Sequence, residues 1–187
     1  RVMPYSNETH LTRVIGKSEE DIERLLNHYS LDDIKRLFPF WHNGVIMQIT
    51  NQPVDIMIEK WLYEEYPELR EVQKKSIDKQ LNEAVTVLSK EYEKKAPQHL
   101  YNCINIMNYA YLRLLGHVME INMIKPYNQT PYINRGKELA SLTEKIPAND
   151  FAGDIEKINK WAEYLNISEW FSWIDFEQIP AGYEEMI

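Results

Sequence analysis

Residues 98–124 read QHLYNCINIMNYAYLRLLGHVMEINMI, and this stretch decides the fold. Its apolar residues recur at three- and four-residue spacing and continue almost all the way round a helix. A helix on the surface of a protein keeps one polar face, whereas a helix that is apolar on every side lies inside. Pro97 precedes the stretch and Pro126 follows it. We therefore expect a central helix at about 97–124.

The neighbouring segments show helical spacing with one solvated face. From Pro67 to about Lys95, apolar residues recur along one side, and opposite charges stand four residues apart, as in Lys79 and Glu83. The chain has only six glycines, and strand-like alternation is rare. We predict an all-α fold, an irregular multi-helix bundle around the central helix with a small C-terminal helical subdomain.

Prolines and caps suggest how the chain is divided. Residues 1–17 have no clear period and are expected to form an extended N-terminal arm. The main helical bundle is expected over 18–124, where Pro39 should stop or kink a helix that Ser30 begins. Residues 45–49 fit a strand or a helical turn, with a helix favoured. Residues 125–187 are expected to form a loop and C-terminal helices, including one at 168–178, packed on the bundle within one domain.

The composition argues against binding to nucleic acid. The 187 residues carry a net charge of −8, whereas affinity for a phosphate backbone comes from clustered lysine and arginine. A basic patch on the predicted helices competes with salt bridges to neighbouring acids, and its members are Lys74, Lys75, Lys79, Lys90, Lys94 and Lys95. Nucleic acid is therefore not expected as a partner.

The sequence indicates a cytoplasmic protein without a membrane partner. No run approaches the roughly 18 to 20 apolar residues that a spanning helix needs, and the first residues do not resemble a signal region. Cys103 is the single cysteine, which excludes an intramolecular disulfide and fits a reducing compartment. The richness in Asn, Ile, Lys, Glu and Tyr suggests an AT-rich genome, such as that of a low-GC bacterium, its phage or a protozoan.

The end of the chain offers the strongest functional lead. Residues 166–187 read NISEWFSWIDFEQIPAGYEEMI and combine aromatic rings with carboxylates, and no lysine or arginine follows Lys160. Exposed rings supply binding energy in a partner's pocket, and charge steers the approach. The predicted partner-binding residues are Trp161, Trp170, Phe171, Trp173, Asp175, Phe176, Glu177, Tyr127 and Tyr132. Alternatively, the rings anchor the terminal helix to the bundle and only the carboxylates face water.

These observations favour an acidic helical protein–protein interaction module, acting as an inhibitor, adaptor or assembly factor. Its expected partner is another protein with an apolar groove and a basic rim, and a homo-oligomer stays open. The sequence predicts no catalytic residue, no metal ligand and no cofactor.

The rival hypothesis is a small metal-dependent hydrolase acting on nucleotides or RNA. His99 and Cys103 stand four residues apart, a spacing that places two metal ligands on one helix face. No Gly-rich phosphate loop, His-Glu-x-x-His motif or cysteine cluster accompanies them. The candidate residues are Glu65, Glu68, His99, His117 and Glu120. A binding protein is favoured, and the question of an enzyme stays open.

Arg36 and His42 have five residues between them, a spacing found in the RNA-cleaving sites of some small helical ribonucleases. In those enzymes the pair acts from a helix. Here Pro39 lies between the two residues, so we do not expect a helix to set their geometry.

Overall fold

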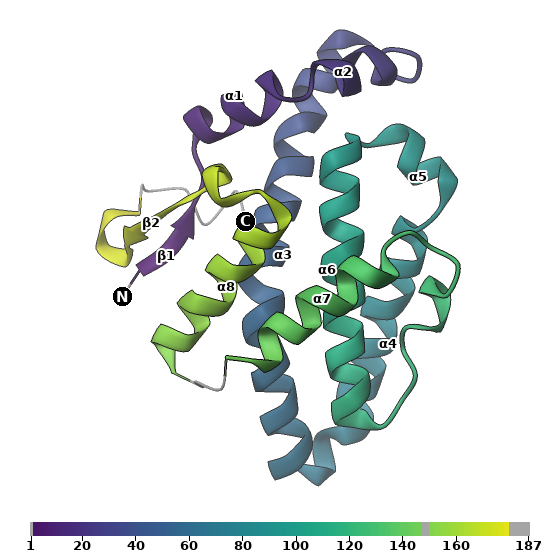
Figure 1. Ribbon diagram of the computed structural model, residues 1–187, viewed down its shortest axis with the longest axis vertical. Helices are drawn as coiled ribbons and strands as arrows, with labels where there is room; N and C mark the ends of the chain where they lie inside the picture. The colour runs from purple at the N-terminus through teal and green to yellow at the C-terminus, as the bar shows by residue number, and fades with distance from the viewer. Residues whose placement is uncertain (1, 147–149, 180–187) are drawn as a thin grey trace.

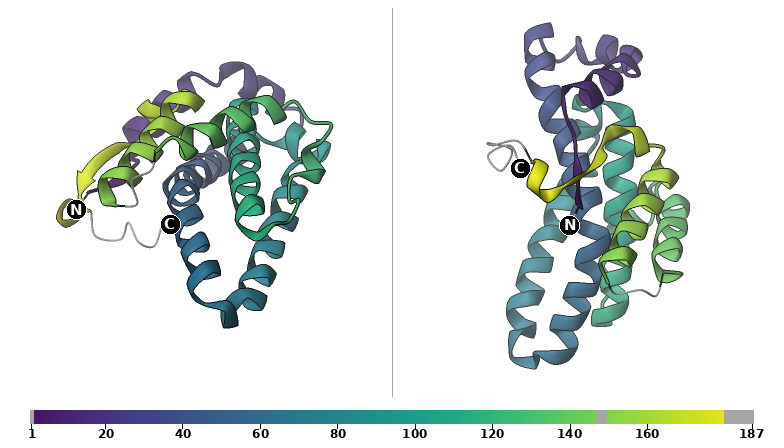
Figure 2. Two further views of the ribbon diagram at one scale, coloured as in Figure 1. Left: turned by 60° about the horizontal axis from the view of Figure 1, so that its bottom comes forward. Right: turned by 90° about the vertical axis from the view of Figure 1, so that its left-hand side faces the viewer.

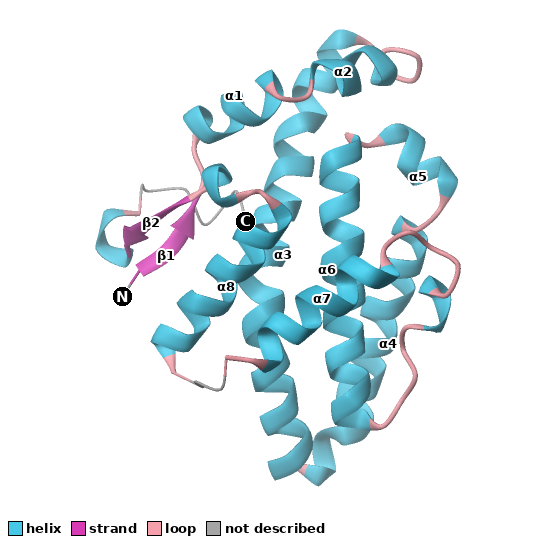
Figure 3. Cartoon of the chain, in the orientation of Figure 1, coloured by secondary structure: helices cyan, strands magenta, loops and turns pink. Residues whose placement is uncertain are grey.

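The computed structural model describes residues 2–146 and 150–179, and helices dominate this part of the chain, as predicted (Figures 1 and 3). The elements follow in the order β1 (Val2–Tyr5), α1 (Glu8–Gly16), α2 (Glu19–Leu25), α3 (Leu31–Glu65), η1 (Pro67–Leu69), α4 (Arg70–Val87), α5 (Lys90–Lys95), α6 (Gln98–Met119), η2 (Lys125–Tyr127), α7 (Ile133–Glu144), α8 (Phe151–Leu165), η3 (Ser168–Trp170), β2 (Ser172–Asp175) and η4 (Phe176–Gln178).

The apolar helix α6 is buried along most of its length. Met107, Ala110 and Leu115 are completely inaccessible to solvent. Helices α3 and α7 make the most extensive contacts with it, and α7 and α8 form a second layer against α3 and α6 (Figure 2). The expectation of a bundle around the stretch at 97–124 is therefore confirmed.

Helix α3 is the longest helix among the described residues, so Pro39 does not stop a helix, and a kink at this position stays a prediction. The helix runs without interruption from Leu31 to Glu65 and includes both Pro39 and Pro53. A proline inside a helix costs about 3 kcal/mol, because it removes a backbone hydrogen bond and crowds the preceding turn. Burial of Phe38, Val45 and other side chains on this helix offsets that cost.

The N-terminal arm is only partly extended. Residues Val2–Tyr5 form β1, whereas Glu8–Gly16 form helix α1. The Asn7 side chain begins this helix by accepting hydrogen bonds from the backbone N–H groups of Thr9 and His10. This cap explains why α1 begins here, although the spacing of apolar residues in this segment gives only a weak helical pattern.

The predicted helix at 168–178 is wrong. Residues Ser172–Asp175 form β2, which pairs antiparallel with β1 in the register Val2 to Asp175 and Tyr5 to Ser172. Two short 3-10 turns, η3 and η4, flank the strand. One hydrophobic core includes side chains from both ends of the chain, from Val14 to Phe171. The expected division into a main bundle at 18–124 and a C-terminal part at 125–187 stays a prediction.

Candidate functional site

The structure places five of the predicted partner-binding rings in the core. Trp161 has no exposed surface, and its Nε1 donates to Thr143 Oγ1 at 2.7 Å, which joins α8 to α7. Tyr127 packs edge-on against Tyr109, with 5.6 Å between ring centroids. The buried rings are Trp161, Trp170, Phe171, Tyr127 and Tyr132. In the folded chain these side chains stabilise the bundle and are not presented to solvent.

The remaining predicted residues lie around β2. Phe176 is 60% exposed, and Asp175 and Glu177 beside it are exposed as well. Trp173 is half-buried, and its Nε1 donates to Asn159 Oδ1 at 2.9 Å. Among residues 172–179, the surface expected here therefore consists of Phe176 between two exposed carboxylates, with Trp173 half-buried beside it. Its role in partner binding stays a prediction.

A second group of exposed apolar side chains lies on the second half of α3, where sequence reasoning proposed no site. Val54, Ile58 and Trp61 stand four and three residues apart, and Met57 stands three residues after Val54 and four before Trp61, which places the four side chains on one side of the helix. Trp61 is 53% exposed and Ile58 is 48% exposed. These four residues, here named the Trp61 face, line an open hollow of about 450 Å³.

The charged groups around the Trp61 face are paired with one another. Lys60 Nζ lies 3.9 Å from Glu64 Oε1, and Asp154 Oδ1 of α8 lies 3.3 Å from Lys157 Nζ. The Trp61 ring packs edge-on against Tyr66, with 5.0 Å between centroids. One neighbouring ring therefore packs against Trp61, and paired charges border the apolar surface.

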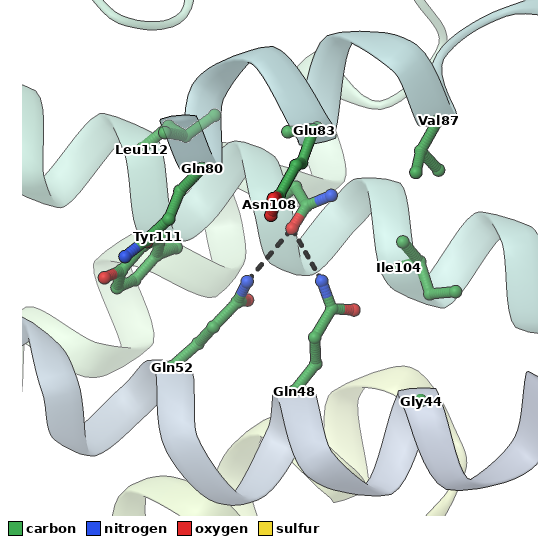
Figure 4. A pocket seen from close by; sticks show the side chains of 11 residues that line it. Gly44, Gln48, Gln52, Gln80, Glu83, Val87, Ile104, Asn108, Tyr111 and Leu112 are labelled. Atoms are coloured by element: carbon green, nitrogen blue, oxygen red, sulfur yellow. Dashed lines mark hydrogen bonds between the residues drawn. The ribbon is translucent and has the colours of Figure 1, made fainter. Parts of the chain in front are cut away.

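A second hollow, of about 330 Å³, lies between α3, α4 and α6 (Figure 4). Asn108 Oδ1 accepts hydrogen bonds from Gln48 Nε2 at 2.7 Å and from Gln52 Nε2 at 3.0 Å. We name this hollow the amide pocket after these three side chains. Its apolar walls are formed by Ala84, Val87, Ile104 and Leu112. Sequence reasoning missed it, although two glutamines four apart on α3 were a usable signal.

Carboxyl groups follow the glutamines along α3 and change the electrostatics there. Burial raises the pKa of Asp55, and the nearby charge of Glu59 adds to the rise. The pKa of the Tyr111 hydroxyl is also raised, mainly by burial and further by these two carboxylates. Tyr111, which lines the amide pocket, therefore stays protonated and neutral near pH 7.

His42 is buried where the two ends of the chain meet. Its Nε2 lies 2.7 Å from Ser6 Oγ, which donates to the carbonyl oxygen of Trp170 at 2.9 Å. Burial lowers the pKa of His42 to about 4, and the charge of His10 contributes. Arg36 and His42 lie on one continuous helix, contrary to expectation, but Arg36 is exposed and pairs with Asp33 at 2.6 Å. This histidine is a neutral structural group.

The structure separates the residues of the hydrolase hypothesis. His99 and His117 lie 18 positions apart on α6, which is about 27 Å of helix rise. Glu120 ends α6 in the left-handed conformation, at φ 56°, and Glu65 and Glu68 lie at the turn between α3 and α4. Burial raises the pKa of the Cys103 thiol to about 12, which makes it a weak metal ligand and nucleophile.

Among the described residues, no group of three or more His, Cys, Asp or Glu side chains is placed to hold a metal ion. Within the same part of the chain, no helix combines the length and the apolar character needed to cross a membrane. No family model, curated protein or solved structure matches the chain.

Proposed function

We propose that this acidic helical protein is a protein–protein interaction module, acting as an inhibitor, adaptor or assembly factor, and that the Trp61 face is its main contact surface. The observation that carries the proposal is a half-exposed tryptophan at the edge of an apolar hollow of about 450 Å³. Exposed tryptophans that enter a partner's pocket are typical of binding hot spots.

The expected partner is a protein that presents apolar side chains flanked by lysine or arginine. The apolar side chains would fill the hollow beside Ile58 and Trp61. The chain carries a net charge of −8, so a basic rim on the partner would be attracted during approach. Phe176, which is exposed between Asp175 and Glu177, is a secondary contact in this proposal. The buried, unreactive Cys103 suits a reducing compartment such as the cytoplasm.

A site-specific photo-cross-link tests the proposal. Ile58 is replaced by benzoyl-phenylalanine, which keeps Trp61 intact, and the protein is irradiated in its native cells. The matched control carries the same group in place of Phe40, which is 70% exposed on the same helix and lies about 27 Å away along the helix axis. We expect a protein that cross-links only from position 58, through a segment with apolar and basic residues.

Two results would contradict the proposal. Equal cross-links from positions 58 and 40 would mean that the introduced benzoyl-phenylalanine reacts with proteins non-specifically at both positions. A cross-link from position 58 to a second copy of this chain would assign the Trp61 face to self-association instead of to a separate partner.

A further inference from the structure

An open hollow of about 570 Å³ lies at the C-terminal end of α6, on residues that the Trp61 face does not include. Its lining comes from the last turns of the helix and from residues 120–124. The chain turns back sharply here, because Glu120 adopts the left-handed conformation and the Ile121 N–H donates to the Gly116 carbonyl oxygen at 3.0 Å. A Cβ atom at Gly116 would lie 2.5 Å from the Ile121 carbonyl oxygen, so a side chain there would open the turn. We name this hollow the Arg113 hollow.

Two opposite charges in this lining are unpaired among the described residues. Arg113 is half-buried, and its guanidinium group makes no hydrogen bond or ion pair within that part of the chain. Glu120 is exposed, and its carboxylate has no partner there either. A half-buried guanidinium group has lost part of its hydration, and pairing with an anion would compensate for that loss. The other half-buried basic side chains in the described ranges each have a partner, and they are Arg24, Arg70 and Lys74.

The positions of the two charges determine what each of them can bind. Arg113 and Glu120 stand seven residues apart, which is about 10 Å of helix rise. Glu120 also lies at the end of α6, where the free carbonyl groups of a helix carry partial negative charge. A cation is therefore favoured at Glu120 and an anion at Arg113, whereas a dianion such as phosphate would be repelled by the helix end. His117 in the same lining already faces Glu144, with Nδ1 and Oε1 3.8 Å apart.

We propose that the Arg113 hollow binds a short peptide with free ends, its carboxylate at Arg113 and its ammonium group at Glu120. An extended chain spans about 3.3–3.6 Å per residue, so two or three residues match the separation of the two charges. The planar guanidinium group suits a carboxylate because it can donate two parallel N–H groups to it. Ile121 and Ile124 are partly exposed and offer apolar contacts to the peptide side chains. The volume of about 570 Å³ falls within the roughly 300–1,000 Å³ of ligand pockets.

Calorimetric titrations of the intact chain with four probes test this inference. The probes are the tripeptide Leu-Ala-Leu, its N-acetylated form without the ammonium group, its C-terminal amide without the carboxylate, and free leucine. We expect each blocked tripeptide to bind at least about tenfold more weakly than the free one, because each loses one charge-assisted interaction. Leucine carries both charges but is too short to reach both side chains, so it should also bind at least about tenfold more weakly.

Two variants assign the ends of the peptide to the two side chains. In Arg113→Gln the free and the amidated tripeptide should bind equally, because the partner of the carboxylate is gone. In Glu120→Gln the free and the acetylated tripeptide should bind equally. The matched controls Arg13→Gln and Glu23→Gln change exposed residues of α1 and α2 and should keep the pattern of the unmodified chain.

Each comparison is made between two peptides on one protein, so a small change in the stability of a variant does not affect it. Leucine that binds as tightly as the tripeptide would overturn the choice of a peptide and assign the hollow to a free amino acid. No binding of any probe, or blocked tripeptides that bind as tightly as the free one, would overturn the inference as a whole.

Discussion

At the residue scale, His42 shows how one buried side chain holds the two ends of the chain together. It is 1% exposed on α3, and it contacts Ser6 from the N-terminal segment and the ring of Trp170 from η3. Because the hydroxyl proton of Ser6 is donated to the carbonyl oxygen of Trp170, His42 donates its Nε2–H to Ser6 Oγ. A second proton would place a charge in this apolar environment.

The low pKa of His42 predicts that acid destabilises the protein. In the folded chain the pKa is about 4, against an ordinary value of 6.5, so unfolding takes up a proton between these pH values. The stabilising contribution is complete above about pH 6.5 and is lost as the pH falls towards 4. Between pH 7.5 and 5.0 we expect a loss of about 2 kcal/mol in the free energy of unfolding, measured by urea denaturation.

Two histidine variants separate this effect from the general response to acid. His42→Gln removes the titrating group and keeps a hydrogen-bond donor for Ser6, so its stability should fall less between the two pH values. His28→Gln changes an exposed histidine and should behave like the unmodified chain. An identical fall in stability for His42→Gln and His28→Gln would contradict the assignment.

At the element scale, α3 is continuous because burial outweighs the local cost of its prolines. Prolines predict helix ends when a segment is judged alone, but Phe38 is completely buried one position before Pro39. Its neighbours Ile34 and Trp41 join the same core. The missing backbone hydrogen bond at Pro39 therefore destabilises the helix, and the burial of these side chains compensates for it.

Pro39→Ala should stabilise the protein. Alanine restores the N–H that can donate to the carbonyl oxygen of Lys35, and it favours the helix more than proline does. We expect the free energy of unfolding to rise by about 1–3 kcal/mol in chemical denaturation. Pro131→Ala, in the exposed loop before α7, should have no stabilising effect. A decrease in stability for Pro39→Ala would show that the proline is required by the packing of α3.

The contact between α6 and α7 depends on the absence of a side chain at Gly136. A Cβ atom at this position would lie 2.3 Å from the Tyr109 ring, which is itself buried. We expect Gly136→Ala to destabilise the protein by about 1–3 kcal/mol in denaturant titrations, because a packed ring must move.

Gly44→Ala is the matched control for this prediction. Gly44 lies inside α3, and a Cβ atom there would meet nothing within 4 Å. This substitution should stabilise the protein by about 0.5–1 kcal/mol through helix propensity. Gly136→Ala and Gly44→Ala changing stability in the same direction would contradict the proposed close packing of α7 on α6.

At the scale of the whole molecule, the sequence predicted the helical architecture and misplaced the exposed aromatic surface. The period of α6 is a local property, so its central position could be inferred from the residues alone. Exposure depends on which elements pack together. Trp161 and Trp170 are buried because α7, α3 and the N-terminal segment cover them. Trp61 is exposed although its apolar spacing resembles that of a core helix.

The pairing of β1 with β2 could not be predicted for a related reason. The two strands lie at opposite ends of the chain, and each has only four residues. Neither strand shows a pattern long enough to distinguish it from a helical turn. The amide pocket left a weaker trace in the sequence. Asn108 lies between apolar residues of α6, and a polar residue at such a position needs a hydrogen-bond partner.

The affinity of the cross-linked partner for four purified proteins tests the central claim most directly. These are the unmodified chain and the variants Trp61→Ala, Phe40→Ala and Phe176→Ala, each verified as folded. We predict that Trp61→Ala raises Kd by about thirtyfold or more, equivalent to about 2 kcal/mol. Phe176→Ala should have a smaller effect and Phe40→Ala none. An unchanged Kd for Trp61→Ala would contradict the assignment of the Trp61 face as the binding surface.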